Sequence, residues 1–427
     1  MTLTLLFVVF AVLLLLEVPV AFAMLAASVV YMLVDGLFPI TVIVQRMAPG
    51  LNSFPFLAIP LFILAGNLLN QTGVANRIFA FALSLVGHVR GSLGHVNVLA
   101  SIIFAGMSGV AAADAAGLGA IEVRAMKKAG FGAAFSAAIT ASSSIIGPII
   151  PPSVIMVLYA VMAQVSIADM FLAGVIPGLL MGLLLMATVY FLARTGRIEA
   201  PVFPRAPTSD IARTFVRAIP ALLAPGFLVG GLLLGVATPT ELGALTCAYA
   251  VMLGLAYRTL TITRLLYALR ETAAVCGVIL FLIAVGMPFG WIIAVNNLPA
   301  LLTDSILALT ANPILVLLII SGGIFLAGMV MEPTPILLIA VPMVYPVIQA
   351  VGIDPVHFGI VIILNVVIGV TTPPIGMILF IMMDVAQVSM RQLTIAMLPF
   401  YIPLVAMLFL LIFVPGLALF LPNLVGG

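Results

Sequence analysis

Apolar runs long enough to cross a lipid bilayer follow one another along almost the whole chain, starting at Thr2. The 427 residues are 65% hydrophobic and 7% charged, a balance that soluble domains do not reach. A membrane-spanning helix needs about 20 apolar residues, which leaves room for roughly ten to fourteen membrane-embedded segments. The sequence therefore predicts an all-α polytopic membrane protein.

The N-terminal stretch MTLTLLFVVFAVLLLLEVPVAFAM (residues 1–24) lacks the basic region and the small-residue cleavage site of a secretory signal. It is predicted to be the first membrane segment and to stay in the mature chain. The three histidines have no metal-ligand spacing, and Cys247 and Cys276 lie in apolar runs, where we expect them to be packing residues. We expect no resident metal or haem, and a net charge of +2 gives no support for nucleic-acid binding.

Lysines and arginines gather in four places, which the positive-inside rule assigns to the cytoplasm. These are Arg90 with Arg124, Lys127 and Lys128; the run from Arg194 to Arg217; the run from Arg258 to Arg270; and Arg391. The most hydrophilic stretch, residues 194–217, is predicted to be a cytoplasmic linker between two halves, residues 1–193 and 218–427. The pattern leaves open at which interface Arg46 and Arg77 lie.

Two segments, at about residues 91–128 and 312–355, are predicted to be re-entrant hairpins. Each has a small-residue or proline break at its centre, FAGMSGVAAADAAG (104–117) and AGMVMEPTP (327–335), so its arms are too short to cross the bilayer separately. The first hairpin has basic ends and is expected to open to the cytoplasm. The second has no Lys or Arg at its ends and is expected to open to the outside.

Two further apolar segments, at about residues 131–165 and 356–388, contain Gly-Pro and Pro-Pro breaks. Proline removes a backbone N–H and disrupts the helix, so SSSIIGPIIPPS (142–153) and GVTTPPIG (369–376) predict broken helices. The Pro-Pro pairs lie 222 residues apart, and so do the two AGM tripeptides at 105–107 and 327–329. A repeat whose hairpins face opposite sides is an inverted repeat, which is typical of secondary transporters.

Broken helices place free carbonyl oxygens and half-helix N-termini at membrane depth. Oxygen ligands suit a hard cation, and half-helix N-termini suit a carboxylate, so we expect two cation sites around one central anion site. The candidate anion-binding residues are Ser144, Ser153, Glu332, Thr334 and Thr371. For Glu332, helix capping and a ligand role both remain open, whereas capping is favoured for Glu241 and a polar structural role for Asp114.

The stretches FAGMSGVAAADAAGLGAIEVRAMKKAGF, AAITASSSIIGPIIPPSVIMVLYA and GVTTPPIGMILF resemble the large membrane subunit of tripartite ATP-independent periplasmic (TRAP) transporters, the DctM-type family. The resemblance covers essentially the whole chain. It implies a sodium-driven elevator-type transporter of a bacterial or archaeal inner membrane, with Na⁺ as coupling ion and no other cofactor. The helices near 2–34 and 219–257 would belong to a scaffold.

The resemblance also implies partners and a ligand set. A DctP-type periplasmic binding protein would deliver an organic anion, usually a carboxylate, to a complex with a small four-helix DctQ-type subunit, which this unfused chain would need separately. The resemblance implies two sets of sodium ligands in this sequence. They are Ala105, Ser108, Gly147, Ile150 and Pro152 for the first site, and Gly328, Gly369 and Thr372 for the second. Some family members have a polar residue where Ala105 stands, so only its carbonyl could serve here.

Three other functions make different demands on the sequence. A stand-alone sodium/dicarboxylate symporter shares such hairpins but needs no binding protein. An intramembrane enzyme would need a paired Ser/His, twin aspartates or an HExxH motif at membrane depth, and none is present. An ATP-driven permease would need an ATPase partner. The identity of the organic anion does not follow from the sequence.

Overall fold

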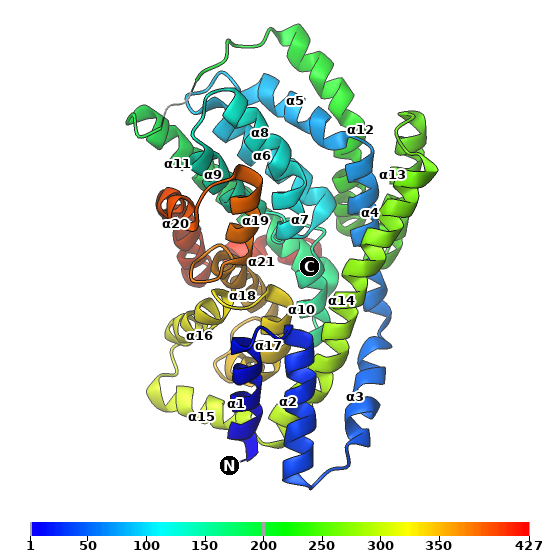
Figure 1. Ribbon diagram of the computed structural model, residues 1–427, viewed down its shortest axis with the longest axis vertical. Coiled ribbons are helices and arrows are strands. Elements are labelled where there is room, and N and C mark those ends of the chain that lie inside the picture. The colour runs from blue at the N-terminus through cyan, green and yellow to red at the C-terminus, as the bar shows by residue number, and fades with distance from the viewer. Residues whose placement is uncertain (1, 199–200, 427) are drawn as a thin grey trace.

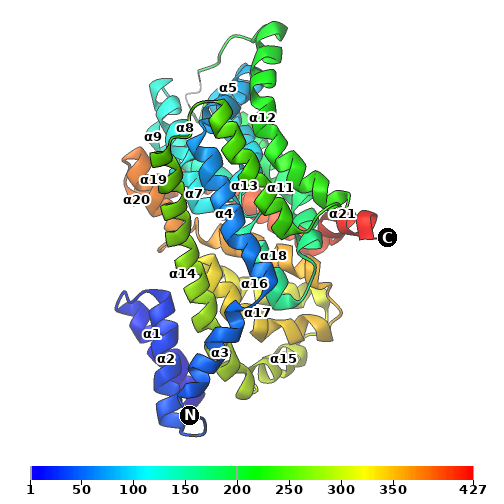
Figure 2. The same ribbon diagram turned by 90° about the vertical axis from the view of Figure 1, so that its right-hand side faces the viewer.

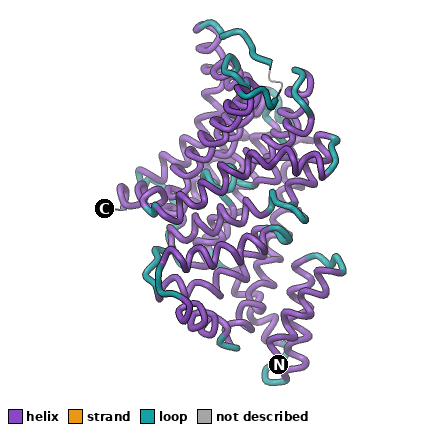
Figure 3. Tube along the Cα trace, turned by 90° about the vertical axis from the view of Figure 1, so that its left-hand side faces the viewer, coloured by secondary structure: helices purple, strands orange, loops and turns teal. Residues whose placement is uncertain are grey.

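The computed structural model describes residues 2–198 and 201–426. Within these ranges every regular element is a helix, as the purple trace of Figure 3 shows. Seven helices are long and apolar enough to cross a membrane, and ten shorter apolar helices accompany them. The all-helical polytopic architecture is confirmed. The long helices are fewer than the predicted segments because hairpin arms and broken helices are short.

In the first half, eleven α-helices and one short 3₁₀ helix follow one another. They are α1 (Thr2–Leu15), α2 (Val20–Asp35), α3 (Thr41–Leu51), η1 (Phe54–Leu57), α4 (Ala58–Gln71), α5 (Val74–Val86), α6 (Ser92–Ser108), α7 (Ala111–Ala116), α8 (Leu118–Lys128), α9 (Ala133–Ser144), α10 (Val154–Ala163) and α11 (Ile167–Arg194). The predicted first hairpin is thus built from α6, α7 and α8, and the first broken helix from α9 and α10.

The second half contains ten α-helices. They are α12 (Thr208–Leu233), α13 (Pro239–Ala256), α14 (Ile262–Val295), α15 (Leu298–Leu309), α16 (Pro313–Gly328), α17 (Pro333–Ala350), α18 (Pro355–Gly369), α19 (Met377–Ala386), α20 (Met390–Phe413) and α21 (Gly416–Gly426). The second hairpin is built from α16 and α17, and the second broken helix from α18 and α19.

The helix starts repeat along the chain. α6 begins at residue 92 and α16 at 313, while α9 begins at 133 and α18 at 355, which gives separations of 221 and 222. α10 and α19 begin at 154 and 377, and α11 and α20 at 167 and 390, so both pairs are 223 apart. The offset read from the motifs therefore recurs in the elements themselves, while α21 follows the last repeated helix.

Two predicted boundaries are wrong. Residues 1–24 do not form one segment, because the chain turns between Leu15 and Val20, with Glu17 at φ +61°, and α1 packs against α2. The hydrophilic stretch 194–217 is not all linker, because α12 already begins at Thr208.

The long helix α14 separates the two arginines that the sequence left unplaced. With 34 residues it is about 50 Å long, and Figures 1 and 2 show it running from near α5 to near α3 and α15. Arg77 lies over the ring of Tyr257, 3.3 Å from its centroid, near the basic start of α14. Arg46 lies over Trp291, 5.1 Å from its centroid, near the other end.

The two halves pack into each other around the broken helices. The second part of the first broken helix, α10, contacts α17 and α18 of the second half. In the same way α19, the second part of the second broken helix, contacts α7 and α9 of the first half. Figure 1 shows α7, α10, α18 and α19 near the middle of the molecule. Both breaks are therefore held inside one packed body.

Candidate functional site

At the first site the hairpin tip after α6 lies directly against the first break. A Cβ built on Gly109, which has φ +67°, would lie 2.1 Å from the carbonyl oxygen of Pro152. A Cβ on Gly147 would lie 2.3 Å from Oδ2 of Asp114. Only glycine allows backbone to approach this closely, so the small residues of the tip and break are explained by their contact.

The second site has the same construction with a different contact. Gly328 ends α16 and Gly369 ends α18, and a Cβ on Gly369 would lie 2.6 Å from the Cα of Gly328. Beyond this crossing the Met329 carbonyl accepts hydrogen bonds from the backbone N–H groups of Ile375 and Gly376, at 3.2 and 3.3 Å. The tip is thereby fixed to the far side of the break.

The prolines remove the usual helical donor of one carbonyl at each break, although the Gly369 carbonyl accepts from the Thr372 N–H at 2.8 Å instead. In a continuous helix, Pro151 would donate to the carbonyl of Gly147 and Pro373 to that of Gly369, but proline has no N–H to donate. Both glycines belong to the expected sodium ligands, and carbonyl oxygen is the ligand type that a hard cation takes. The Pro151–Pro152 and Pro373–Pro374 bonds are both cis.

The candidate residues of the first half lie together at this break. Ala105 and Ser108 end α6, Ile150 and Pro152 are buried in the break, and Ser153 is the N-cap of α10, where its Oγ accepts from the Met156 N–H at 3.3 Å. The Ser108 hydroxyl donates to the Val110 carbonyl at 3.5 Å. The Ser144 hydroxyl donates to the Ala141 carbonyl at 2.9 Å, so it bonds to its own helix.

In the second half two candidate hydroxyls share one acceptor. Thr371 and Thr372 both donate to the Ile368 carbonyl, at 2.7 and 2.9 Å. Thr334 is buried in the first turn of α17, beside Glu332 at the N-cap. Glu332 is exposed and makes no side-chain capping bond.

The two other acidic residues, Glu241 and Asp114, have different surroundings. Glu241 forms a capping box with Thr238: its Oε2 accepts from the Thr238 N–H at 2.7 Å, and Thr238 Oγ1 accepts from the Glu241 N–H at 3.3 Å. The capping prediction for Glu241 is confirmed. Asp114 is buried, and neither of its carboxyl oxygens has a hydrogen-bond partner within the described part of the chain.

Sequence reasoning missed a polar network behind the first break. The Ser143 hydroxyl donates to Asn97 Oδ1 at 2.7 Å, Asn97 Nδ2 donates to Thr140 Oγ1 at 2.7 Å, and Ser101 donates to Ser143 at 3.0 Å. These bonds join α6 to α9. In the second half Asn365 of α18 donates to the Ser321 carbonyl of α16 at 2.7 Å. The sequence signal for this network is the presence of two amide side chains, Asn97 and Asn365, in otherwise apolar segments.

A further missed contact stands at the second break. The Tyr401 hydroxyl of α20 donates to the carbonyl of Thr371, so an aromatic side chain from a neighbouring helix holds the break from outside it. Nothing in the sequence places Tyr401 beside Thr371, because the two are thirty residues apart and only packing brings them together.

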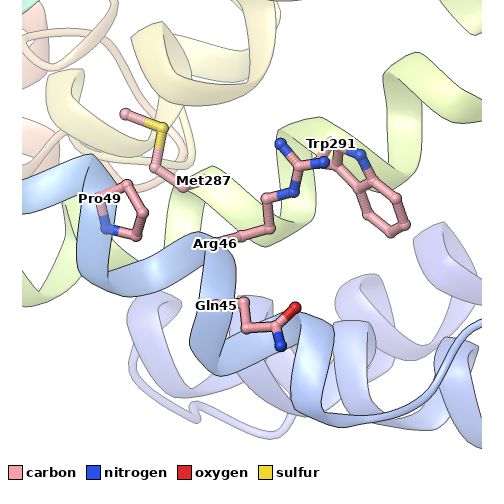
Figure 4. Close-up of a pocket in the computed structure, with 5 residues that line it drawn as sticks. All are labelled: Gln45, Arg46, Pro49, Met287 and Trp291. Atoms are coloured by element: carbon pink, nitrogen blue, oxygen red, sulfur yellow. The ribbon is translucent and has the colours of Figure 1, made fainter.

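The pocket drawn in Figure 4 lies away from both breaks. It has a volume of about 630 Å³ and is lined by Gln45, Arg46, Pro49, Met287 and Trp291, from α3 and α14. The Arg46 guanidinium reaches toward the Trp291 ring across it. Because its lining comes from the helices outside the hairpins and broken helices, this pocket is separate from the candidate transport site.

Comparison with known proteins agrees with the all-helical membrane fold. Residues 7–417 match the family model of the tripartite ATP-independent periplasmic transporter, DctM component. The sialic acid TRAP transporter large permease protein SiaM of Vibrio cholerae is 40% identical over 410 residues, 96% of each chain. The C4-dicarboxylate TRAP transporter large permease protein DctM of Pseudomonas aeruginosa is 34% identical over 374 residues, 87% of each chain.

Two more similarities extend this result. The 2,3-diketo-L-gulonate TRAP transporter large permease protein YiaN of Escherichia coli is 36% identical over 400 residues, 93% of this chain and 94% of that one. The crystal structure of the YdaH transporter of Alcanivorax borkumensis superposes with a TM-score of 0.61 at 16% identity, covering 90% of this chain and 89% of that one. At this identity the superposition shows a shared fold only.

The helical repeats and their paired breaks define a polytopic membrane transporter and not an enzyme. The chain belongs to the DctM family, the large permease subunits of TRAP transporters. It is a multi-pass protein of the bacterial inner membrane. TRAP systems of this family work with a small membrane subunit and a periplasmic binding protein.

Proposed function

We propose that this chain carries an organic anion across the inner membrane together with sodium ions bound at its two breaks. The observation that carries the proposal is the pairing of a glycine-lined hairpin tip with a proline-broken helix in each half: Gly109 against Pro152, and Gly328 against Gly369. A carbonyl freed by proline at membrane depth needs a partner, and a sodium ion is the partner that oxygen ligands suit.

The proposed sodium ligands are those that the resemblance to the DctM-type family implies. The first ion would bind at Ala105, Ser108, Gly147, Ile150 and Pro152, and the second at Gly328, Gly369 and Thr372. Support comes from the close approach of Gly147 to Asp114 and of Gly328 to Gly369, which gathers both ligand sets at their tips. The lone pairs of Thr372 Oγ1 stay available, because its hydroxyl uses its proton to bond the Ile368 carbonyl.

The proposed substrate is an organic acid bound between the two breaks. The relatives are described as transporters of sialic acid, 2,3-diketo-L-gulonate and C4-dicarboxylates, all of which bear a carboxylate. The N-termini of α10 and α17 begin at Ser153 and Glu332, and helix N-termini favour an anion. Ser144, Ser153, Glu332, Thr334 and Thr371 are the residues proposed to bind it, with Glu332 able to share a cation with the substrate carboxylate.

We further propose an elevator mechanism within the TRAP assembly. The hairpins and broken helices, residues 91–165 and 312–388, would move as a transport domain against a scaffold that contains α1, α2, α12 and α13. The packing of α10 on α17 and α18, and of α19 on α7 and α9, supports treating these segments as one moving body. A DctQ-type small subunit would brace the scaffold, and a DctP-type binding protein would deliver the anion.

The test is uptake into proteoliposomes that contain this subunit and its small partner, with the cognate binding protein outside. Uptake driven by an inward sodium gradient and lost without the binding protein is the expected result. Uptake that ignores the sodium gradient would refute sodium coupling. Uptake that persists without the binding protein would instead favour a stand-alone sodium/dicarboxylate symporter.

A further inference from the structure

A buried carboxylate faces the first break and has no hydrogen-bond partner among residues 2–198 and 201–426. Asp114 lies in α7, is 3% exposed, and neither Oδ1 nor Oδ2 has a hydrogen-bond partner within the described residues. Its Oδ2 would lie 2.3 Å from a Cβ on Gly147, so the carboxylate rests directly on the backbone of the break. The hydroxyl of Ser108 donates to the Val110 carbonyl at 3.5 Å and also lies near the Asp114 carboxylate, but it favours the charge less than burial disfavours it.

An unpaired carboxylate is among the most unfavourable groups to bury. Across residues 2–198 and 201–426 the single ion pair within 4 Å joins Arg213 to Asp210, on the exposed start of α12. Asp114 therefore has no basic side chain to compensate its charge. A positive ion beside the carboxylate would supply that compensation without any rearrangement of the protein.

The surroundings of Asp114 are those of a cation site. Pro151 leaves the carbonyl of Gly147 without its helical donor, and the Pro152 carbonyl faces Gly109. Carbonyl oxygens with a carboxylate form the all-oxygen environment that hard cations take. Without Asp114, the ligand set proposed above would be formally neutral.

We propose that the carboxylate of Asp114 is a ligand of the cation at the first break and supplies the negative charge of that site. This inference rests on the proposed function. It makes the two breaks unequal, because the position 222 residues after Asp114 is Ile336, a buried apolar residue. The first sodium site then has a charged ligand, whereas the ligands proposed for the second, Gly328, Gly369 and Thr372, are neutral, so the first site binds its ion more tightly.

Glu122 provides a matched control. It is 1% exposed, both of its carboxyl oxygens lack a hydrogen-bond partner within the described chain, and it lies near enough to Asp114 for the two charges to interact. Its position is on α8, whereas the contact with Gly147 is made by Asp114. Glu122→Gln therefore removes a similarly buried charge without removing the proposed ligand.

The experiment measures sodium binding without transport. The large subunit with its small partner is purified, and its thermal unfolding midpoint is recorded as NaCl replaces choline chloride at constant ionic strength. Wild type should be stabilised by sodium. Asp114→Asn should unfold no earlier than wild type without sodium, because an uncompensated charge is gone. It should need about tenfold more sodium or more for the same stabilisation, since a charged ligand in a low-dielectric site contributes at least that factor.

Glu122→Gln should change the sodium midpoint much less than Asp114→Asn, because its carboxylate acts on the ion only from a greater distance. An Asp114→Asn protein with the wild-type sodium midpoint, or one less stable than wild type without sodium, overturns the inference. An equal loss of sodium affinity in both variants also overturns it, because the loss would then not depend on the contact with Gly147. Absence of any sodium effect on wild type, together with sodium-independent uptake, is a failure of the proposed function itself.

Discussion

Gly328 and Gly369 cross backbone to backbone, with the Cα of Gly328 only 2.6 Å from the position that a Cβ on Gly369 would occupy. A methyl group at Gly369 must therefore push α16 and α18 apart. We expect Gly369→Ala to destabilise the protein by about 1–3 kcal/mol and to abolish sodium-driven uptake, as measured by unfolding and by proteoliposome transport.

The control for this substitution lies on the same helix pair. A Cβ on Gly322 or Gly323 of α16 would meet nothing within 4 Å. Gly322→Ala should therefore keep transport and stability near wild type, within about 0.5 kcal/mol. Equal damage from both substitutions would show that the crossing of the two glycines has no special importance.

The hydroxyl of Thr372 provides a test of the second sodium site. Thr372→Val keeps the shape of the side chain and removes the oxygen, whereas Thr372→Ser keeps the oxygen. We expect the valine variant to raise the sodium concentration for half-maximal uptake about tenfold, the effect of losing roughly 1.4 kcal/mol of binding. The serine variant should stay close to wild type. A valine variant with unchanged sodium dependence would remove Thr372 from the ligand set.

The amide of Asn97 joins α6 to α9 through Thr140 and Ser143. Asn97→Leu removes both bonds, while Thr140 still donates to the Ser136 carbonyl and Ser143 to the Thr140 carbonyl. The loss of a hydrogen bond costs about 0.5–1.5 kcal/mol. We expect a fall in the unfolding midpoint of the purified protein. Ser305→Ala, which removes an exposed hydroxyl bonded to Leu301 in its own helix, should leave the midpoint almost unchanged.

The placement of Arg46 and Arg77 predicts the orientation of the scaffold. Because Arg77 lies over Tyr257, next to Arg258, that end should face the cytoplasm, and Arg46 at the other end of α14 should face the periplasm. With Cys247 and Cys276 replaced by alanine, Arg46→Cys should react with a membrane-impermeant maleimide in intact cells. Arg258→Cys should react only after the inner membrane is opened. The reverse labelling pattern would contradict this orientation.

The hairpins and broken helices were predictable because their signals are local. Proline and glycine interrupt helices at the residue where they stand, so the breaks at 142–153 and 369–376 fall between the helices that the structure describes. The start of α12 was missed because a hydrophilic sequence is compatible with a helix outside the membrane. The turn at Glu17 was missed because uniform hydrophobicity on both sides hides a change of direction.

The detail of the site depends on contacts that no local pattern contains. The hydrogen bond of Tyr401 to the second break and the burial of Asp114 arise only when distant helices pack. In the sequence Asp114 follows the small-residue hairpin tip, and this position alone favours a polar structural role. Its lack of any partner becomes visible only once every neighbour is placed.

The reciprocal packing of α10 on α17 and α18, and of α19 on α7 and α9, has a consequence for energy conservation. Each broken helix packs against the opposite half of the chain, so the two breaks can change the side of the membrane that they face only together. A cycle that carried one sodium ion inward while the other site stayed behind would first have to separate these packed helices. If sodium ions bind at both breaks as proposed, the packing makes the transfer of one ion without the other costly.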